Sequence, residues 1–246
     1  LDGVRGNVLS STQADAAEAL KAQVRAEGFN VSLLDGVTGS GKTEVYLQAI
    51  AHALEQGKGA IVLVPEISLT PQTVERFKAR FSSGKLQTLV AVLHSHLSAG
   101  ERHDEWHKIR QGRARIVIGA RSAIFAPVEP LGLIIVDEEH DSSFKQQDGL
   151  RYSARDMAVA RAKQLNIPIL LGSATPSLES YHNALAGRYR LVRLTRRAVE
   201  EAQLPAIRCV DMRLEKPADG LSSKLLQALT ENIQNGRQSL VFINRR

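Results

Sequence analysis

The sequence is poor in cysteine and in aromatic residues. It contains one cysteine, Cys209, and one tryptophan, and aromatic residues make up 4% of its 246 positions. A single cysteine excludes an internal disulfide bond and a cysteine-rich zinc site within this sequence. No apolar run reaches the roughly 18 residues that a membrane-spanning helix needs, and the first residues lack the pattern of a signal peptide. We therefore expect a cytoplasmic protein that binds no membrane, and the initial Leu1 in place of methionine indicates a piece of a longer protein.

The charge of the chain is positive. Lysine and arginine number 32 against 26 acidic residues, which gives a net charge of +6 and a sequence pI of about 9.6. This charge favours a nucleic-acid partner, although many basic proteins bind none. The length suits one large domain, or one domain and part of another.

Apolar runs alternate with helical patterns along most of the chain. The runs are continuous in valine, isoleucine and leucine, which is typical of a parallel sheet covered by helices on both faces. Because the polar motifs follow the strands directly, they should gather at one edge of the sheet, where ligands bind in open α/β folds. The predicted strands are 31–34, 60–64, 88–93, 115–119, 131–136 and 168–172, and the predicted helices are 13–27, 44–50, one from 71, 99–111 and 153–165.

The alternation weakens after about residue 195. A short strand is predicted at 207–212, in which Cys209 would be a small buried residue. A helix at 222–235 and a strand at 239–243 then begin a second α/β unit that is too short to make its own core. The predicted organisation is a linker at 1–12, an α/β lobe at 13–195, an inter-lobe linker at 196–220 and the start of a second lobe at 221–246.

A phosphate-binding loop lies between the first predicted strand and the next helix. The pattern G-x-x-x-x-G-K-[ST] needs this context, because its glycines turn backbone N–H groups toward the phosphates at a helix N-terminus. Lys42 is expected to contact the β- and γ-phosphates of ATP, and Thr43 to hold Mg²⁺ through its hydroxyl. The alternative is a chance glycine-rich turn. The loop comprises Gly36, Val37, Thr38, Gly39, Ser40, Gly41, Lys42 and Thr43.

An acidic pair follows the fifth predicted strand. Asp137 is expected to hold Mg²⁺ through its water shell, and Glu138 to polarise the attacking water as general base. The alternative is a pair of surface carboxylates at a strand end. Because the preceding strand at 131–136 is apolar, we expect Asp137 to be buried, which favours the catalytic interpretation.

Six motifs together resemble the superfamily 2 helicases and, within them, the replication-restart helicases of bacteria. The resemblance extends from about Leu9 to the last residue and implies a RecA-like P-loop NTPase lobe followed by the start of a second lobe. The motifs are 36–44 (GVTGSGKTE), 64–72 (VPEISLTPQ), 118–123 (IGARSA), 137–141 (DEEHD), 172–175 (GSAT) and 242–246 (FINRR).

The resemblance implies an ATP-dependent DNA helicase that moves 3′→5′ and restarts replication at stalled forks. Its cofactors would be ATP and Mg²⁺. Its partners would be single-stranded and forked DNA, PriB, DnaT and single-strand binding protein. The protein would lie in the nucleoid region of the cytoplasm. The family's zinc-binding cysteines would lie downstream, and its 3′-end-binding domain upstream. The arginine that completes the ATPase site would come from beyond Arg246, so we expect this chain to bind ATP–Mg²⁺ but to hydrolyse it very slowly.

The same resemblance implies roles for further residues. Gln13 lies where helicases recognise adenine, although the adjoining Ser-Ser-Thr is an imperfect match, and Glu44 extends the ATP-binding loop. The loop at 142–152 corresponds to an aromatic-rich loop of the family, but here it has only Phe144 and Tyr152. The residues implied to contact DNA or to couple hydrolysis to motion are Gln72, Arg121, Ser122, His140, Lys145, Arg151, Tyr152, Ser173 and Thr175.

General chemistry supports some of these assignments and leaves alternatives. Arg121 follows a strand end and would contact a phosphate, or else be a helix-capping or solvated arginine. His140 beside the acidic pair would sense the nucleotide, or else be an ordinary strand-end histidine. Lys145, Arg151 and Arg155 form a basic cluster that would line a DNA path, or else a solvated surface.

Two features imitate other kinds of site. His103 and His107 have the spacing of a zinc protease motif, but aspartate follows the first histidine and no third ligand is evident. Trp106 between them is expected to pack in the core rather than stack on a base.

Two other functions remain open on the sequence. One is an RNA helicase or another superfamily 2 translocase, because DEEH does not itself distinguish DNA from RNA. The other is a non-catalytic nucleotide-binding switch, which would bind partners in a nucleotide-dependent manner without affinity for nucleic acid.

Overall fold

The computed structural model describes residues 11–26, 28–37, 40–194, 206–214 and 220–242. The chain divides into a main unit, Leu1–Glu201, and a tail unit, Ala202–Arg246. Several sequence predictions lie outside the described residues: most of the linker at 1–12, Thr38 and Gly39 of the phosphate loop, the linker residues 196–205 and 215–219, and the end of the last predicted strand and motif at 243–246.

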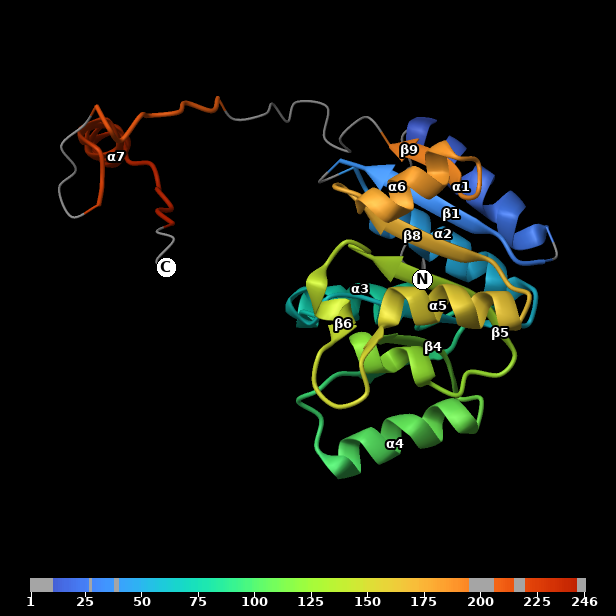
Figure 1. Cartoon of the computed structure of the whole chain (residues 1–246). Helices are drawn as coiled ribbons and strands as arrows, with labels where there is room; N and C mark the ends of the chain where they lie inside the picture. Colours follow the sequence, from blue (N-terminus) through green and yellow to red (C-terminus); the bar gives the residue numbers. More distant parts are fainter. Residues whose placement is uncertain (1–10, 27, 38–39, 195–205, 215–219, 243–246) are drawn as a thin grey trace. The chain divides into compact units, whose positions relative to one another are not determined.

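The main unit is built on a seven-stranded sheet in which every pair of neighbours is parallel (Figure 1). The strand order is β3-β4-β2-β5-β8-β1-β9, which confirms the predicted α/β class with a parallel sheet. The edge strand β9 was not predicted. The strands are β1 (Val31–Gly36), β2 (Gly59–Leu63), β3 (Leu89–Leu93), β4 (Ala114–Gly119), β5 (Leu131–Asp137), β8 (Ile169–Ser173) and β9 (Arg190–Leu194).

Helices cover both faces of this sheet. Buried residues of α1, α2 and α3 form one core cluster with one face, and buried residues of α4, α5 and α6 form a second cluster with the other. No helix in the described ranges is long and apolar enough to cross a membrane. The helices are α1 (Ser11–Arg25), α2 (Lys42–Glu55), α3 (Pro71–Arg80), α4 (Ala99–Arg110), α5 (Ala154–Gln164) and α6 (Leu178–Leu185).

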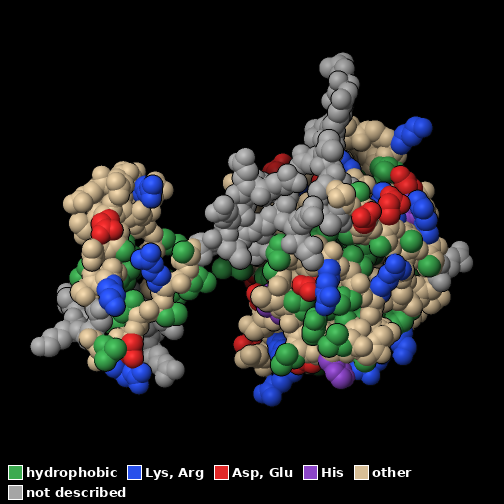
Figure 2. Space-filling model, turned by 90° about the horizontal axis from the view of Figure 1, so that it is seen from above, with side chains coloured by type: hydrophobic (Ala, Val, Ile, Leu, Met, Phe, Trp, Pro, Cys, Tyr) green, Lys and Arg blue, Asp and Glu red, His purple; other side chains and the backbone are tan. Residues whose placement is uncertain are grey.

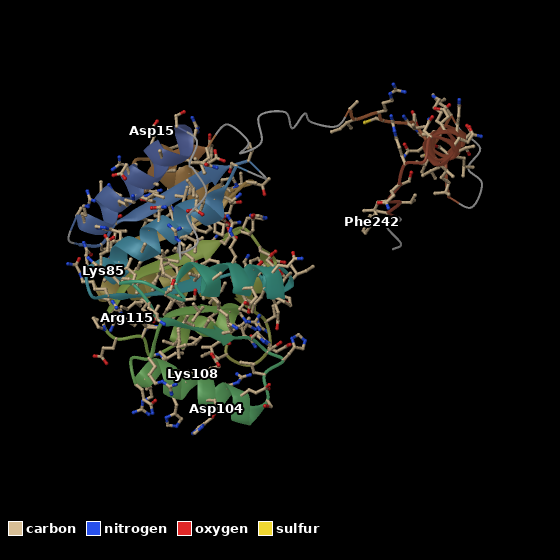
Figure 3. All side chains as sticks on the ribbon, turned by 180° about the vertical axis from the view of Figure 1, so that it is seen from behind. Asp15, Lys85, Asp104, Lys108, Arg115 and Phe242 are labelled. Carbon is tan, nitrogen blue, oxygen red and sulfur yellow. The ribbon has the colours of Figure 1, made fainter. Side chains whose placement is uncertain are left out.

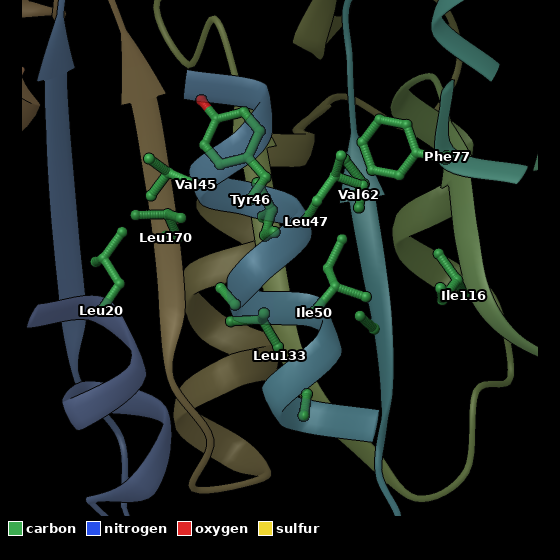
Figure 4. Packing of buried hydrophobic residues seen from close by; sticks show 14 of the residues in the cluster. Leu20, Val45, Tyr46, Leu47, Ile50, Val62, Phe77, Ile116, Leu133 and Leu170 are labelled. Carbon is green, nitrogen blue, oxygen red and sulfur yellow. The ribbon is translucent and has the colours of Figure 1, made fainter. Parts of the chain in front are cut away.

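Helix α2 anchors the phosphate loop to the core. Figure 4 shows Tyr46, Leu47 and Ile50 of this helix packed among sheet residues such as Val62 and Leu170, and all five are buried. Burying a side chain of this size contributes about 1.5–3 kcal/mol, so several such residues fix α2 firmly on the sheet. The first turn of α2, at the end of the phosphate loop, is therefore held in place because the following residues of the same helix are packed on the sheet.

Short side-chain caps set where the other helices begin. Thr70 caps α3, with Pro71 at its first position, and Ser98 forms a capping box with Glu101 at the start of α4. Ser153 caps α5 and Ser177 caps α6. A small antiparallel hairpin, β6 (Lys145–Gln146) and β7 (Tyr152–Ser153), lies in the segment that was predicted to be a loop.

Three 3₁₀ turns follow strand ends directly or after a short loop: η1 (Glu66–Ser68), η2 (Arg121–Phe125) and η3 (Ser142–Phe144). They lie at the carboxyl edge of the sheet, where the polar motifs were predicted to gather.

The tail unit contains α7 (Ser223–Gln234), which confirms the predicted helix, but two other predictions there are wrong. No strand forms at 207–212 or in the described part of 239–243, and Cys209 is exposed, not buried. A strand needs neighbours for its backbone hydrogen bonds, and the described residues of this unit, 206–214 and 220–242, form no sheet. Several of its apolar side chains are accordingly exposed, among them Ile233 and Phe242, and Phe242 is labelled in Figure 3.

Candidate functional site

Three predicted motifs meet because their strands are neighbours. Strands β5, β8 and β1 are consecutive in the sheet, and they deliver the acidic motif, the GSAT motif and the phosphate loop to the same edge. Asp137 pairs with Gly172 across the β5–β8 ladder, and Asp35 pairs with Ser173 across the β1–β8 ladder. The sheet thus brings together segments more than 90 residues apart in the sequence.

The phosphate loop turns sharply into α2. Gly41 has a left-handed backbone conformation, with φ 83°, and Lys42 is the first helical residue. The Lys42 amine donates a hydrogen bond to the Gly36 carbonyl at 2.8 Å and lies 3.8 Å from Glu138 Oε1. It therefore links the start of the loop to the acidic motif.

Gln13 of α1 braces the phosphate loop. Its side-chain amide donates to the Ser40 carbonyl at 2.7 Å, and a Cβ at Gly41 would collide with this amide. Gln13 is buried, which is unusual for a glutamine and requires such a partner. The structure thus joins two residues that the resemblance assigned separately to the ATP site.

Asp137 is held at the end of β5 by Tyr46. The Tyr46 hydroxyl donates to Asp137 Oδ1 at 2.7 Å, and it lies so close to Gly172 that any side chain there would collide with it. Burial raises the pKa of the Asp137 carboxyl, while the hydrogen bond from Tyr46 and the charge of Lys42 act in the opposite direction. Sequence reasoning missed Tyr46, although it lies one turn after the lysine of the phosphate loop.

Glu138 has an unusual backbone conformation for a residue with a side chain, with φ 48°. Its carboxylate is 3.6 Å from His140 Nδ1 and, as noted, faces Lys42. Burial and, next, repulsion from Asp137 raise the pKa of the Glu138 carboxyl. A strained backbone that aims a partly exposed carboxylate at a lysine is typical of a site under functional constraint.

His140 joins the acidic motif to the GSAT motif. Its Nδ1 is 2.7 Å from Ser173 Oγ, which also accepts a hydrogen bond from the Thr175 backbone N–H at 2.9 Å. Thr175 Oγ1 lies 3.4 Å from the other ring nitrogen of His140. The resemblance assigned Ser173 and Thr175 to coupling, and His140 was expected to sense the nucleotide; the three residues form one connected network.

Glu139 forms a second network, which sequence reasoning missed. Its side chain is 0% exposed, and it accepts hydrogen bonds from the Ser177 backbone N–H at 2.6 Å and from the Ser177 and Ser180 hydroxyls at 2.9 and 2.8 Å. Arg155 of α5 donates to the same carboxylate at 3.2 Å. The network ties β5 to the first turn of α6. Because Arg155 is engaged here, it does not extend the exposed basic cluster with Lys145 and Arg151 as the sequence suggested.

The residues implied to contact DNA lie near the same edge of the sheet, and most of them take no part in the hydrogen-bond networks described above. Gln72, Ser122, Lys145 and Arg151 are exposed. Arg121 donates to the carbonyls of Ser143 and Lys145 at 3.2 and 3.0 Å, so it holds the segment after the acidic motif.

The two aromatic residues of the loop at 142–152 pack against the protein. Phe144 is buried in the core, and the Tyr152 ring packs edge-on against Phe125 with centroids 5.4 Å apart. Acidic and basic side chains are interspersed on the face seen in Figure 2, so charge alone marks no DNA path there.

Glu44 and the paired histidines have local partners. The buried Glu44 carboxylate lies 3.9 and 3.8 Å from Arg76 and Arg80, so it joins α2 to α3. His103 and His107 lie 3.0 Å apart on exposed positions of α4, the helix that carries Asp104 and Lys108 in Figure 3. Within the described residues no third metal-binding side chain joins them, and Trp106 packs against the second core cluster, as expected.

The residues at this edge fit a nucleotide and Mg²⁺. Ser40 Oγ is buried beside Gly36 and has no hydrogen-bond partner among the described residues, so it is a donor within the loop that a phosphate oxygen would satisfy. Lys42 supplies positive charge for phosphates, and the hydroxyl of Thr43 and the carboxylate of Asp137 supply the oxygen ligands that Mg²⁺ prefers.

The sequence of the chain matches a known protein family and several curated relatives. Residues 10–184 match the family model of the DEAD/DEAH box helicases. The chain is 50% identical to the replication restart protein PriA of Bacillus subtilis over 97% of its own length, and 51% identical to PriA of Haemophilus influenzae over 89% of its length. It covers 29% of each of these two proteins, so it spans less than a third of their length.

Solved helicase structures share the fold. RecG bound to a three-way DNA junction is 26% identical, with a TM-score of 0.57, and the match covers 76% of this chain and 24% of that one. The DEAD-box helicase Mss116 bound to single-stranded RNA is 17% identical, with a TM-score of 0.54, and the match covers 77% of this chain and 40% of that one. The second similarity concerns the fold alone.

Proposed function

The chain belongs to the DEAD/DEAH box helicase family, and from this premise we propose that it is the ATP-binding lobe of a DNA helicase that restarts replication. The observation that carries the proposal is the meeting of Lys42, Glu138 and the His140–Ser173 pair at one sheet edge. The predicted resemblance to the replication-restart helicases is confirmed by the PriA relatives, and the RecG similarity supports DNA as the nucleic acid.

In the proposed mechanism, the phosphate loop and Lys42 bind the β- and γ-phosphates of ATP. The backbone N–H groups at the start of α2 and the lysine charge stabilise the negative charge that develops during phosphoryl transfer. Mg²⁺, when bound, neutralises phosphate charge, and Thr43 and Asp137 are the residues that would hold it. Tyr46 fixes the orientation of Asp137 for this role.

Glu138 is the proposed general base. Its carboxylate is partly exposed, so it is accessible to water, and its backbone conformation holds it near Lys42. A base acts most efficiently when its pKa approaches the working pH, and burial and the Asp137 charge raise the pKa of Glu138 in this direction.

The His140–Ser173–Thr175 network is the proposed route from chemistry to movement. A change at the acidic motif shifts His140, and the shift reaches the GSAT segment through the Ser173 hydroxyl. Translocation 3′→5′, loading at forks, and assembly with PriB, DnaT and single-strand binding protein belong to this proposal through the resemblance alone.

The chain by itself is proposed to bind ATP–Mg²⁺ and to turn it over very slowly. In this class of enzyme an arginine from a second element accelerates hydrolysis roughly 10³–10⁵-fold, and we propose that this arginine comes from a second lobe. Turnover of several ATP per second by this chain, abolished in Lys42→Ala, would contradict this part of the proposal.

The test uses a protein extended to the length of its relatives. ATP hydrolysis is measured without nucleic acid, with forked DNA and with a matched RNA fork, alongside Lys42→Ala and Glu138→Gln. Stimulation by the DNA fork alone, lost in both variants, is the expected result. Equal stimulation by RNA would indicate a broader translocase, and no stimulation by either would leave a nucleotide switch.

A further inference from the structure

A cluster of metal-binding side chains lies apart from the ATP site, at the carboxyl ends of β2 and β3. Glu66 begins η1 after β2, and His94 and His96 follow β3. In the sheet these two strands flank β4, so the cluster bridges loops that are not adjacent in the sequence. One ligand atom from each of the three side chains lies within 4.8 Å of the others.

Hydrogen bonds already orient the cluster. Ser95 donates to Glu66 Oε1 from its backbone N–H at 3.2 Å and also from its hydroxyl. His96 Nδ1 lies 3.3 Å from the same oxygen, and His94 Nδ1 accepts a hydrogen bond from the His96 backbone N–H at 3.2 Å. The bonds from Ser95 hold the orientation of the Glu66 carboxylate in the way that outer-shell partners do at metal sites, whereas the bond to His94 Nδ1 is one that metal ligation would replace.

We propose that Glu66, His94 and His96 bind a Zn²⁺ ion. Two imidazoles and one carboxylate are a ligand set of zinc sites that keep an open fourth position, whereas Mg²⁺ prefers oxygen ligands alone. The site is therefore distinct in chemistry from the Mg²⁺ position at Thr43 and Asp137. It needs no cysteine, so the scarcity of cysteine in this sequence does not exclude it.

The geometry requires only a modest closure. Tetrahedral Zn²⁺ with bonds of about 2.0–2.1 Å places its ligands roughly 3.3 Å apart. The Glu66–His96 pair is already at 3.3 Å, and the His96 side chain is 81% exposed, so it is free to adjust. Ligation through His94 Nδ1 would replace its hydrogen bond with the His96 backbone, a small local change.

A metal at this position would join η1 to the loop after β3. These are separate loops whose described contacts at this point are the Glu66 bonds to Ser95 and His96. A bound ion would stabilise this part of the native structure by mass action, because the unfolded chain does not hold the three ligands together. The inference does not depend on the proposed helicase function.

The test is a titration of the untagged 246-residue chain with Co²⁺, which reports tetrahedral coordination by its visible absorption. A Cys209→Ser background removes the one thiol. We expect one Co²⁺ per chain, displaced by one equivalent of Zn²⁺ and not by Mg²⁺, and a melting temperature that rises with Zn²⁺. In His96→Gln and Glu66→Gln the affinity should fall at least about tenfold and the thermal shift should disappear.

The second histidine pair provides the matched control. His103→Gln combined with His107→Gln should leave the Co²⁺ spectrum and its stoichiometry unchanged. Absence of a tetrahedral spectrum in the parent chain would overturn the proposal. A spectrum that survives His96→Gln and Glu66→Gln but is lost in the double variant would overturn it as well, and would move the metal to α4.

Discussion

Glu138 and Glu139 are neighbours in the chain, but their side chains belong to two differently built regions. Glu138 is 31% exposed and faces Lys42 across 3.8 Å, with burial and Asp137 raising its pKa. Glu139 is 0% exposed, and its carboxylate is satisfied by Arg155, Ser177 and Ser180. We call the first region the open side, comprising Lys42 and Glu138, and the second the closed side, comprising Glu139, Arg155, Ser177 and Ser180.

The difference shows how one strand end serves two purposes. A buried carboxylate with full hydrogen bonding is a rigid support, because loss of its arginine would leave the charge uncompensated and loss of a serine would leave an acceptor without a donor. A partly exposed carboxylate with a raised pKa retains the capacity to accept a proton. The closed side thus holds the acidic motif in place and leaves the Glu138 carboxylate accessible, as its proposed role as general base requires.

The largest expected effect concerns the open side. In the extended protein, Glu138→Gln should lower ATP turnover about 10²–10⁴-fold, because it removes the proposed general base. The affinity for ATP should change little, since the proposed phosphate contacts remain. Steady-state hydrolysis and binding of a fluorescent ATP analogue measure the two quantities.

Glu75→Gln, at an exposed position of α3, serves as the control for this substitution. Turnover of Glu138→Gln within a few-fold of the parent would contradict the assignment.

The second effect concerns the closed side. Arg155→Met should lower the free energy of unfolding by about 3–5 kcal/mol, because it leaves the Glu139 charge buried without its partner. Urea unfolding followed through the single tryptophan, Trp106, measures this change. Lys163→Met on the same helix is exposed and should cost less than about 0.5 kcal/mol. Equal losses in the two variants would show that the ion pair does not support the fold.

The third effect distinguishes the contribution of the Lys42 charge to ATP binding from its contribution to the stability of the fold. Lys42→Ala should weaken ATP binding by about 1.5–3 kcal/mol, or roughly 10- to 150-fold, because it removes a charged hydrogen-bond donor. Its free energy of unfolding should stay near that of the parent. Lys85→Ala is the control, since Lys85 is an exposed lysine away from the site (Figure 3). Unchanged ATP affinity in Lys42→Ala would show that Lys42 and its loop do not bind the phosphates of ATP.

The smallest effect concerns the link between the two motifs. Ser173→Ala should leave the affinity for ATP unchanged. The rate of DNA-stimulated hydrolysis should fall roughly 2- to 12-fold, because His140 loses a hydrogen-bond partner worth about 0.5–1.5 kcal/mol. Comparing stimulated with unstimulated hydrolysis isolates this term, and Ser82→Ala is an exposed control. A loss of equal size in both rates would indicate a general effect and not coupling.

The open side was largely predictable from the sequence, and the closed side was not. The phosphate loop and the acidic pair are continuous patterns that follow apolar strands, so Lys42 and Glu138 could be placed at one sheet edge. Glu139 is adjacent to them, but its partners come from α5 and α6, and their approach depends on how these helices pack on β5 and β8. No spacing in the sequence specifies that contact.

The missed and wrong elements have similar causes. Strand β9 is short and is interrupted by Arg190 and Arg193, and it becomes a strand because β1 offers a free edge. Segment 207–212 has comparable apolar character, yet it forms no strand and leaves Cys209 exposed, because it pairs with no strand among the described residues. Local pattern alone does not separate these two cases, since tertiary pairing decides them.

The most direct test of the account compares the two neighbouring glutamates in this chain. Glu138→Gln and Glu139→Gln make the same chemical change at adjacent positions, and urea unfolding reports the cost of each. Glu138→Gln should leave the free energy of unfolding within about 0.5 kcal/mol of the parent, because its side chain is partly exposed. Glu139→Gln should lower it by about 3 kcal/mol, because Arg155 and the hydroxyls of Ser177 and Ser180 lose the buried carboxylate that accepts their hydrogen bonds, although Asp156 still pairs with Arg155. Similar values for the two variants would contradict the division into an open and a closed side.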